Sequence, residues 1–177
     1  MASMRDIKQR ITNVSSTEQI IKAMDTIAST KLHKARAQLE GVRPLYYALK
    51  DQTTELGRHP EAKKSVYFAK REVKSSLYIV MASDQGVAGA YNAKILQLAL
   101  QHMEGKNEKI LVIGSKGHEF FRRKKKNVIR HITDVADSQV YYGSEDLAKW
   151  VTKRYVDGEV DEVFVVYTYF ENVLNYV

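Results

Sequence analysis

Two glycine-containing loops are the stretches of this sequence whose residue types could bind a phosphate. The first, SDQGVAGAYN at residues 83–92, lies between an apolar run and a helical pattern, and a helix amino terminus binds anions. A dinucleotide-binding turn needs G-x-G-x-x-G, for which Gly86 and Gly89 supply only two counterparts, and Asp84 would repel a phosphate. The second loop, residues 114–117, lacks the spacing G-x-x-x-x-G-K-[ST]. Both loops are therefore interpreted as tight turns with close helix–strand packing.

No other group of residues has the spacing of a catalytic or metal site. The five histidines lack paired spacing such as H-E-x-x-H, and His118 has no second histidine four residues on. The absence of cysteine excludes disulfides and cysteine-ligated metals, and no Ser-x-Gly nucleophile elbow occurs. The acidic residues of 157–162 surround an expected turn, where carboxylates are ordinarily solvated. We predict no catalytic residue, no metal and no cofactor.

The elements that would position these loops alternate between strand and helix patterns. Apolar runs predict strands at 77–82, 109–114, 128–132 and 162–170. Helical patterns lie between them, from Ala88 to Met103, from a capping Ser115 to about Lys125, and from a capping Ser144 to the turn Asp157-Gly158; residues 133–142 receive no assignment. This alternation predicts an α/β domain over 76–177 with a parallel, doubly wound, Rossmann-like sheet.

Residues 1–57 carry the pattern of one long coiled-coil helix. Ser3 and Asp6 fit a capping box at its start, and Gly57, His59 and Pro60 form a stop. At 1.5 Å per residue the helix would be roughly 80 Å long. The apolar stripe of the helix, with steps of four and three, consists of Ile7, Ile11, Val14, Ile21, Ala28, Leu32, Ala35, Leu39 and Val42, and a second line of Ile20, Met24 and Ile27 widens it.

A helix of this length needs a packing partner, because residues 13–17 are weak helix formers. Nothing later in the chain offers a matching helix, so the partner is expected to be another chain or a segment outside this sequence. The alternative is two or three ordinary helices, broken near Ser15 and Pro44 and folded back as a small bundle. Residues 58–75 are polar and basic and are interpreted as a linker.

The net charge of +7 allows a nucleic-acid-binding interpretation, supported by the basic residues of 31–36 and 122–126. An acidic protein partner explains the same charge and is preferred. No apolar run is long enough to span a membrane, and the amino terminus lacks the apolar core of a signal peptide. The chain is expected to be soluble and cytoplasmic.

Two stretches carry a family resemblance. The run MRDIKQRITNVSSTEQIIKAMDTIASTKLHKA resembles the amino-terminal helix of the gamma subunit of bacterial F-type ATP synthases, most specifically in IKAMDTIASTKL. The loop SDQGVAGAYN resembles the family's Asp-Arg-Gly-Leu-x-Gly motif, in order and spacing, although Gln85 stands where the family usually has Arg. A second departure is that the chain stops at Val177, before the family's long carboxy-terminal helix, which pairs with the first to form the rotor shaft.

The resemblance implies a non-catalytic central-stalk rotor that couples proton or sodium translocation to ATP synthesis. It implies contacts with the alpha and beta subunits of the catalytic head, the epsilon subunit and the c-ring, at the cytoplasmic face of the membrane and without membrane insertion or nucleic acid. The expected rotor-helix interface is Ile7, Ile11, Val14, Ile20, Met24, Ile27, Lys31, Leu32, Lys34 and Arg36, and the motif loop is Ser83, Asp84, Gln85, Gly86, Gly89 and Asn92. The alternative function is a phosphate- or nucleotide-binding α/β module with a helical dimerisation arm.

Overall fold

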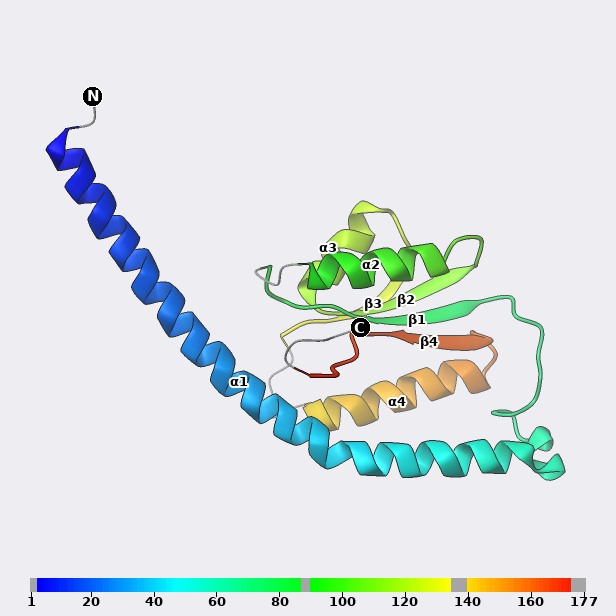
Figure 1. The fold of residues 1–177 in the computed structure, drawn as a ribbon. Coiled ribbons are helices and arrows are strands. Elements are labelled where there is room, and N and C mark those ends of the chain that lie inside the picture. Colours follow the sequence, from blue (N-terminus) through cyan, green and yellow to red (C-terminus); the bar gives the residue numbers. More distant parts are fainter. Residues whose placement is uncertain (1–2, 87–89, 135–139, 173–177) are drawn as a thin grey trace. The chain divides into compact units, whose positions relative to one another are not determined.

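The computed structural model describes residues 3–86, 90–134 and 140–172, without the side chains of 140–142. The chain divides into two units, Met1–Ala62 and Lys63–Val177. The first is almost entirely one helix and the second is an α/β unit (Figure 1).

Helix α1 is continuous over 55 residues, Met4–Arg58. Its first turn is held by a capping box, in which the Arg5 N–H donates to Ser3 Oγ at 3.2 Å and the Ser3 N–H donates to Asp6 Oδ2 at 3.0 Å. The His59 N–H donates to the carbonyl of Leu56 at the other end. The prediction of one long helix is confirmed, and the alternative of shorter helices folded back as a bundle is wrong.

α1 passes through Pro44 without ending. Proline has no N–H for the carbonyl four residues earlier, and it kinks a helix rather than ending it when the surrounding residues remain helical. Figure 1 shows the axis of α1 changing direction between its light-blue and cyan parts. The weak helix formers of 13–17 are helical too, and Thr17 Oγ1 donates to the Asn13 carbonyl at 2.8 Å.

The second unit is built on a parallel sheet, which confirms the predicted fold class. Its strands are β1 (Ser76–Met81), β2 (Glu108–Ile113), β3 (Val128–Ile132) and β4 (Glu162–Val166), in the order β3-β2-β1-β4. The order reverses between β1 and β4, as in doubly wound sheets. β4 is shorter than predicted because Val166 pairs with Val80, and β1 ends one residue later.

Helices cover both faces of this sheet. α2 (Tyr91–His102) and α3 (Ser115–Arg123) lie on one face and α4 (Val140–Val156) on the other, and a 3₁₀ helix, η1 (Pro60–Lys64), follows α1 (Figure 1). β1 is buried on both sides, since Tyr78 and Val80 enter the core beneath α2 and α3 while Leu77 and Ile79 enter the core beneath α4.

Two helix starts differ from the prediction. Ser144 lies inside α4 rather than capping it, since α4 begins at Val140. α2 begins at Tyr91, and Ala88, where its start was predicted, lies outside the described residues. The expected cap at Ser144 rested on a serine followed by two acidic residues, a pattern that also occurs within helices when tertiary packing extends them.

Candidate functional site

Asp84 joins three loops at the carboxyl edge of the sheet. It follows β1, and its Oδ1 accepts from the N–H of Ser115 at 2.8 Å and from the Ser115 hydroxyl at 2.8 Å, after β2. Its Oδ2 accepts from the N–H of Asp134 at 3.3 Å, after β3. The carboxyl ends of neighbouring parallel strands share one edge, so one side chain reaches both of the other loops.

The same carboxylate caps α3 from outside that helix. The predicted cap, Ser115, is wrong: Ser115 is the first helical residue, and the N-cap residue Gly114 offers no side chain. Negative charge is stabilised at a helix amino terminus, where backbone N–H groups lack partners. The hydrogen bonds from the Ser115 N–H and hydroxyl lower the pKa of Asp84 below its ordinary value of 3.8.

The rest of the motif loop is held from the start of α2. Asn92 Oδ1 accepts from the Ser83 N–H at 2.9 Å, and Asn92 Nδ2 donates to Ser83 Oγ at 2.7 Å. Ser83 Oγ in turn donates to the carbonyl of Gln85 at 2.6 Å. Gln85 and Gly86 are exposed, and Gly89 lies outside the described residues. The structure thus brings Ser83, Asp84 and Asn92 into a hydrogen-bonded turn with Gln85 and Gly86 at its surface.

The glycines of 114–117 serve backbone geometry and packing. Gly114 has a φ of +100°, and a Cβ there would lie 2.2 Å from the carbonyl oxygen of Ala82. A Cβ on Gly117 would lie 2.8 Å from a Val112 methyl carbon. These contacts agree with the interpretation as a tight turn, and the start of α3, where a phosphate would bind, already holds a carboxylate.

The predicted rotor-helix surface lies wholly in solvent on α1. Its seven apolar members are 42–68% exposed; they are Ile7, Ile11, Val14, Ile20, Met24, Ile27 and Leu32. The cations Lys31, Lys34 and Arg36 are exposed as well. Arg36 is ion-paired along the helix, with its Nε 2.7 Å from Glu40 Oε1. An exposed ion pair of this kind contributes ~0–1 kcal/mol, so the pair leaves Arg36 able to exchange partners.

The apolar stripe is longer than the sequence pattern suggested. Because α1 continues past Pro44, the steps of four and three carry on from Val42 through Tyr46, Leu49 and, after a polar position at 53, Leu56. These three side chains are also exposed. The apolar register is therefore the same before and after Pro44, as expected of one continuous helix.

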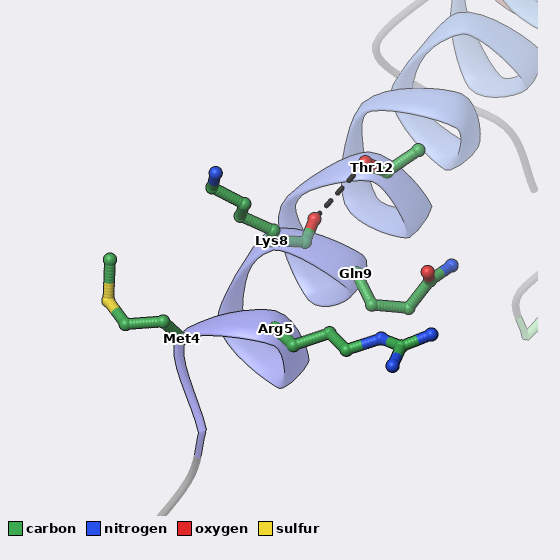
Figure 2. Close-up of a pocket in the computed structure, with 5 residues that line it drawn as sticks. All are labelled: Met4, Arg5, Lys8, Gln9 and Thr12. Carbon is green, nitrogen blue, oxygen red and sulfur yellow. Dashed lines mark hydrogen bonds between the residues drawn. The ribbon is translucent and has the colours of Figure 1, made fainter.

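A shallow hollow at the start of α1 has walls from this one helix. Figure 2 shows its lining side chains, with Met4 and Lys8 on one side and Arg5 and Gln9 on the other, and the Thr12 hydroxyl donating to the Lys8 carbonyl at 3.1 Å. Ligand pockets enclose most of their ligand, which a single helix surface cannot do. This hollow is therefore not a candidate site.

Within residues 3–86, 90–134 and 140–172, no three His, Asp or Glu side chains lie close enough to hold a metal ion. Across the same ranges, no helix has both the length and the apolar character needed to cross a membrane.

Comparison with known proteins identifies the family. The ATP synthase family matches residues 3–177. The ATP synthase gamma chain of Moorella thermoacetica is 35% identical over all of this chain and 64% of its own length. A protein of Acetobacterium woodii named ATP synthase gamma chain, sodium ion specific, is 31% identical over 97% of this chain and 57% of its own length. The chain thus spans about three fifths of the length of these relatives.

Solved structures share the fold. A central stalk and c-ring structure of the Tetrahymena thermophila mitochondrial ATP synthase contains a chain with a TM-score of 0.72 at 23% identity, covering 89% of this chain and 69% of that one. A rotor structure of the Euglena gracilis mitochondrial ATP synthase gives a TM-score of 0.62 at 18% identity, with 97% and 59% covered. The family match over residues 3–177, together with the gamma chain relatives, shows that the chain belongs to the ATP synthase gamma chain family.

Proposed function

We propose that this chain acts in the central-stalk rotor of an F-type ATP synthase, where it couples ion translocation to ATP synthesis and performs no chemistry of its own. One observation carries the proposal: α1 has 55 residues, none of them buried, and its apolar stripe is exposed throughout. A helix of this kind is suited to binding a partner, because each aliphatic side chain that becomes buried contributes about 1.5–3 kcal/mol to the association.

The heptad spacing of the stripe suits a second long helix. Apolar residues at steps of four and three form a seam that faces a partner helix along a left-handed supercoil. Packing on a globular partner would not require this regular spacing. The seam occupies only one face of α1, and Ile20, Met24 and Ile27 form a second line beside it. We propose that the seam packs on the family's carboxy-terminal helix and that the second line faces the catalytic head.

The coupling surface in this proposal is the middle of α1, from Met24 to Arg36. Methionine adapts to surfaces of changing shape, and Lys31, Lys34 and Arg36 supply charge for acidic loops of the alpha and beta subunits. Rotation presents this surface to each catalytic site in turn. A site can be biased only by contacts that differ between its states, so the asymmetry of α1 supplies the coupling free energy.

The α/β unit would contact the epsilon subunit and the c-ring, as a peripheral part of the complex at the cytoplasmic face of the membrane. The coupling ion, proton or sodium, is set by other subunits. The alternative, a phosphate- or nucleotide-binding module with a helical dimerisation arm, is weakened by Asp84, whose carboxylate occupies the amino terminus of α3.

The test is a chimera in which residues 3–177 replace the matching segment of the Moorella thermoacetica gamma chain, assembled with the other subunits of that enzyme in vesicles. The parent chimera should hydrolyse ATP and pump ions. Met24→Lys adds a cation that forms an ion pair, worth ~0–1 kcal/mol, in one rotational state and not in others. We expect hydrolysis near the parent rate and fewer ions pumped per ATP.

Met24→Leu is the matched control, because it keeps an apolar side chain of similar volume and should pump like the parent. An assembled parent chimera that hydrolyses ATP without pumping would contradict the rotor proposal. Equal pumping per ATP in Met24→Lys and Met24→Leu would instead show that Met24 is ordinary helix packing and would refute the assignment of the coupling surface.

A further inference from the structure

The positive charge of this chain is concentrated in one short stretch. Residues 116–131 contain seven Lys or Arg and a single acidic residue, Glu119, for a net charge of +6, whereas the whole chain has +7. The stretch covers α3, the turn after it and most of β3. The remaining 161 residues have a net charge of +1, from +4 in residues 1–58 and −3 in the rest of the chain, so within the α/β unit the net positive charge is confined to this stretch.

Four consecutive cations of this stretch are exposed, and they are here called the basic turn: Arg122, Arg123, Lys124 and Lys125. Lys124 is the C-cap residue of α3, and Lys125 has a left-handed φ of 54°. The next residue, Lys126, is ion-paired with Glu108 at 3.0 Å and half-buried. Within the described ranges, Arg122, Lys124 and Lys125 have no carboxylate within ion-pair distance.

Stability of α3 does not explain four cations. One or two at a helix carboxy terminus contribute 0.3–1 kcal/mol each, an effect confined to about the last turn. Lys124 and Lys125 follow the last helical residue, so additional cations there gain little from the helix dipole. The fold also does not need their side chains, because Phe121 fills the core from α3 while the basic turn lies in solvent. A cluster of exposed positive charges attracts an anionic partner.

We propose that the basic turn binds the anionic headgroups of a lipid bilayer. Clusters of four or more Lys and Arg bind such surfaces through long-range attraction, which needs no groove. Such attraction suits four exposed cations that lie on the last turn of α3 and just after it. Nucleic acid is disfavoured, because single strands stack on exposed aromatic rings, and neighbouring Phe121 is fully buried while Phe120 is partly so.

The test uses the full chain with vesicles of phosphatidylcholine, alone or with about one quarter phosphatidylglycerol, at low and high salt. We expect binding to the anionic vesicles at low salt and its loss at high salt, since salt screens attraction at a surface. The variant carries Arg122→Gln, Arg123→Gln, Lys124→Gln and Lys125→Asn, the last because asparagine tolerates a left-handed φ. At ~1 kcal/mol per cation, its partition coefficient should fall roughly a thousandfold.

The matched control carries Lys50→Gln, Arg58→Gln, Lys63→Gln and Lys70→Gln, which remove the same charge at exposed positions elsewhere and should leave binding nearly unchanged. Equal loss in control and variant would overturn the proposal. So would equal binding to neutral vesicles, which would indicate insertion of the α1 stripe, or binding to duplex DNA or polyglutamate without binding to anionic vesicles.

If the fourfold variant unfolds, as judged by circular dichroism, the double variant Lys124→Gln/Lys125→Asn decides, with an expected loss of about thirtyfold. The outcome is separate from that of the chimera. A chimera that fails to pump would refute the rotor proposal while leaving vesicle binding intact, and a chain that ignores anionic vesicles would leave the rotor proposal standing.

Discussion

Asp84 is only partly buried, yet replacing it with alanine should clearly destabilise the α/β unit. The change removes the acceptor for three donors, the N–H and hydroxyl of Ser115 and the N–H of Asp134. It also removes the negative charge at the start of α3. Because the three donors belong to the loops after β2 and β3, a loss of order should spread from the end of β1 across three strands.

The magnitude follows from two terms. Losing a capping side chain costs about 0.5–2 kcal/mol. Losing the favourable charge at a helix amino terminus adds 0.3–1 kcal/mol. The sum is about 1–3 kcal/mol in the free energy of unfolding, and the substitution Asp84→Asn, which keeps an acceptor but not the charge, should lie near the lower end.

Urea unfolding followed by tryptophan fluorescence measures this loss. Trp150, the only tryptophan, lies on α4, where the Arg154 guanidinium is 3.7 Å from its ring centroid, so its emission reports on the α/β unit and not on α1. Asp134→Asn is the matched control, since it removes a nearby charge and keeps the backbone N–H that Asp84 accepts. If Asp84→Ala and Asp134→Asn unfold at the same urea concentration, the bridging role of Asp84 is wrong.

The contribution of Asp84 should also depend on pH in a stated direction. Its pKa is lower in the folded chain than the ordinary 3.8, so the folded state favours the carboxylate. The stabilisation is fully present above the unfolded pKa and is lost as pH falls through the folded pKa. The difference in unfolding free energy between the parent and Asp84→Asn should therefore be constant near neutral pH and shrink in acid below about pH 4.

Three further predictions concern other features. Calorimetric titration should detect no binding of MgATP in the micromolar range, because neither glycine loop has phosphate-binding spacing. Micromolar binding would contradict this prediction. The chain alone should self-associate through the exposed stripe of α1, and light scattering that reports a monomer at every dilution would refute it. Gly114→Ala should cost several kcal/mol, because of its positive φ and the 2.2 Å approach to Ala82, whereas Gly143→Ala, in open space within α4, should stabilise by about 0.5–1 kcal/mol; thermal unfolding compares the two.

The sheet could be predicted from sequence because its central strands, β1 and β2, are the most buried and carry continuous apolar runs. Each observed strand begins within one residue of its expected position. The end of β4 could not be predicted in this way. Residues 167–170 continue with strand-forming aromatic and β-branched residues, but the ladder with β1 ends at Val166, one residue before β1 itself ends.

The role of Asp84 was missed for a related reason. Its sequence neighbours are glycine-containing turn residues, which indicate a loop but give the carboxylate no partner. The partners lie 31 and 50 residues away and become adjacent only because β1, β2 and β3 align their carboxyl ends. Pattern reasoning assigned the cap of α3 to Ser115, the nearest residue of capping type, whereas tertiary structure supplied a charged acceptor from another loop.

α1 is the opposite case. Its local sequence pattern was sufficient to predict the helix, but it does not explain what stabilises the helix. Its caps, heptad spacing and length were all readable, yet none of its residues is buried, so little burial of apolar surface offsets the backbone entropy cost of ordering it, ~1–2 kcal/mol per residue. Intrachain hydrogen bonds and pairs such as Arg36–Glu40 offset part of this cost along the helix. The weak formers at 13–17 receive the least local support, which makes the helix there the part most dependent on a partner that packs on the stripe.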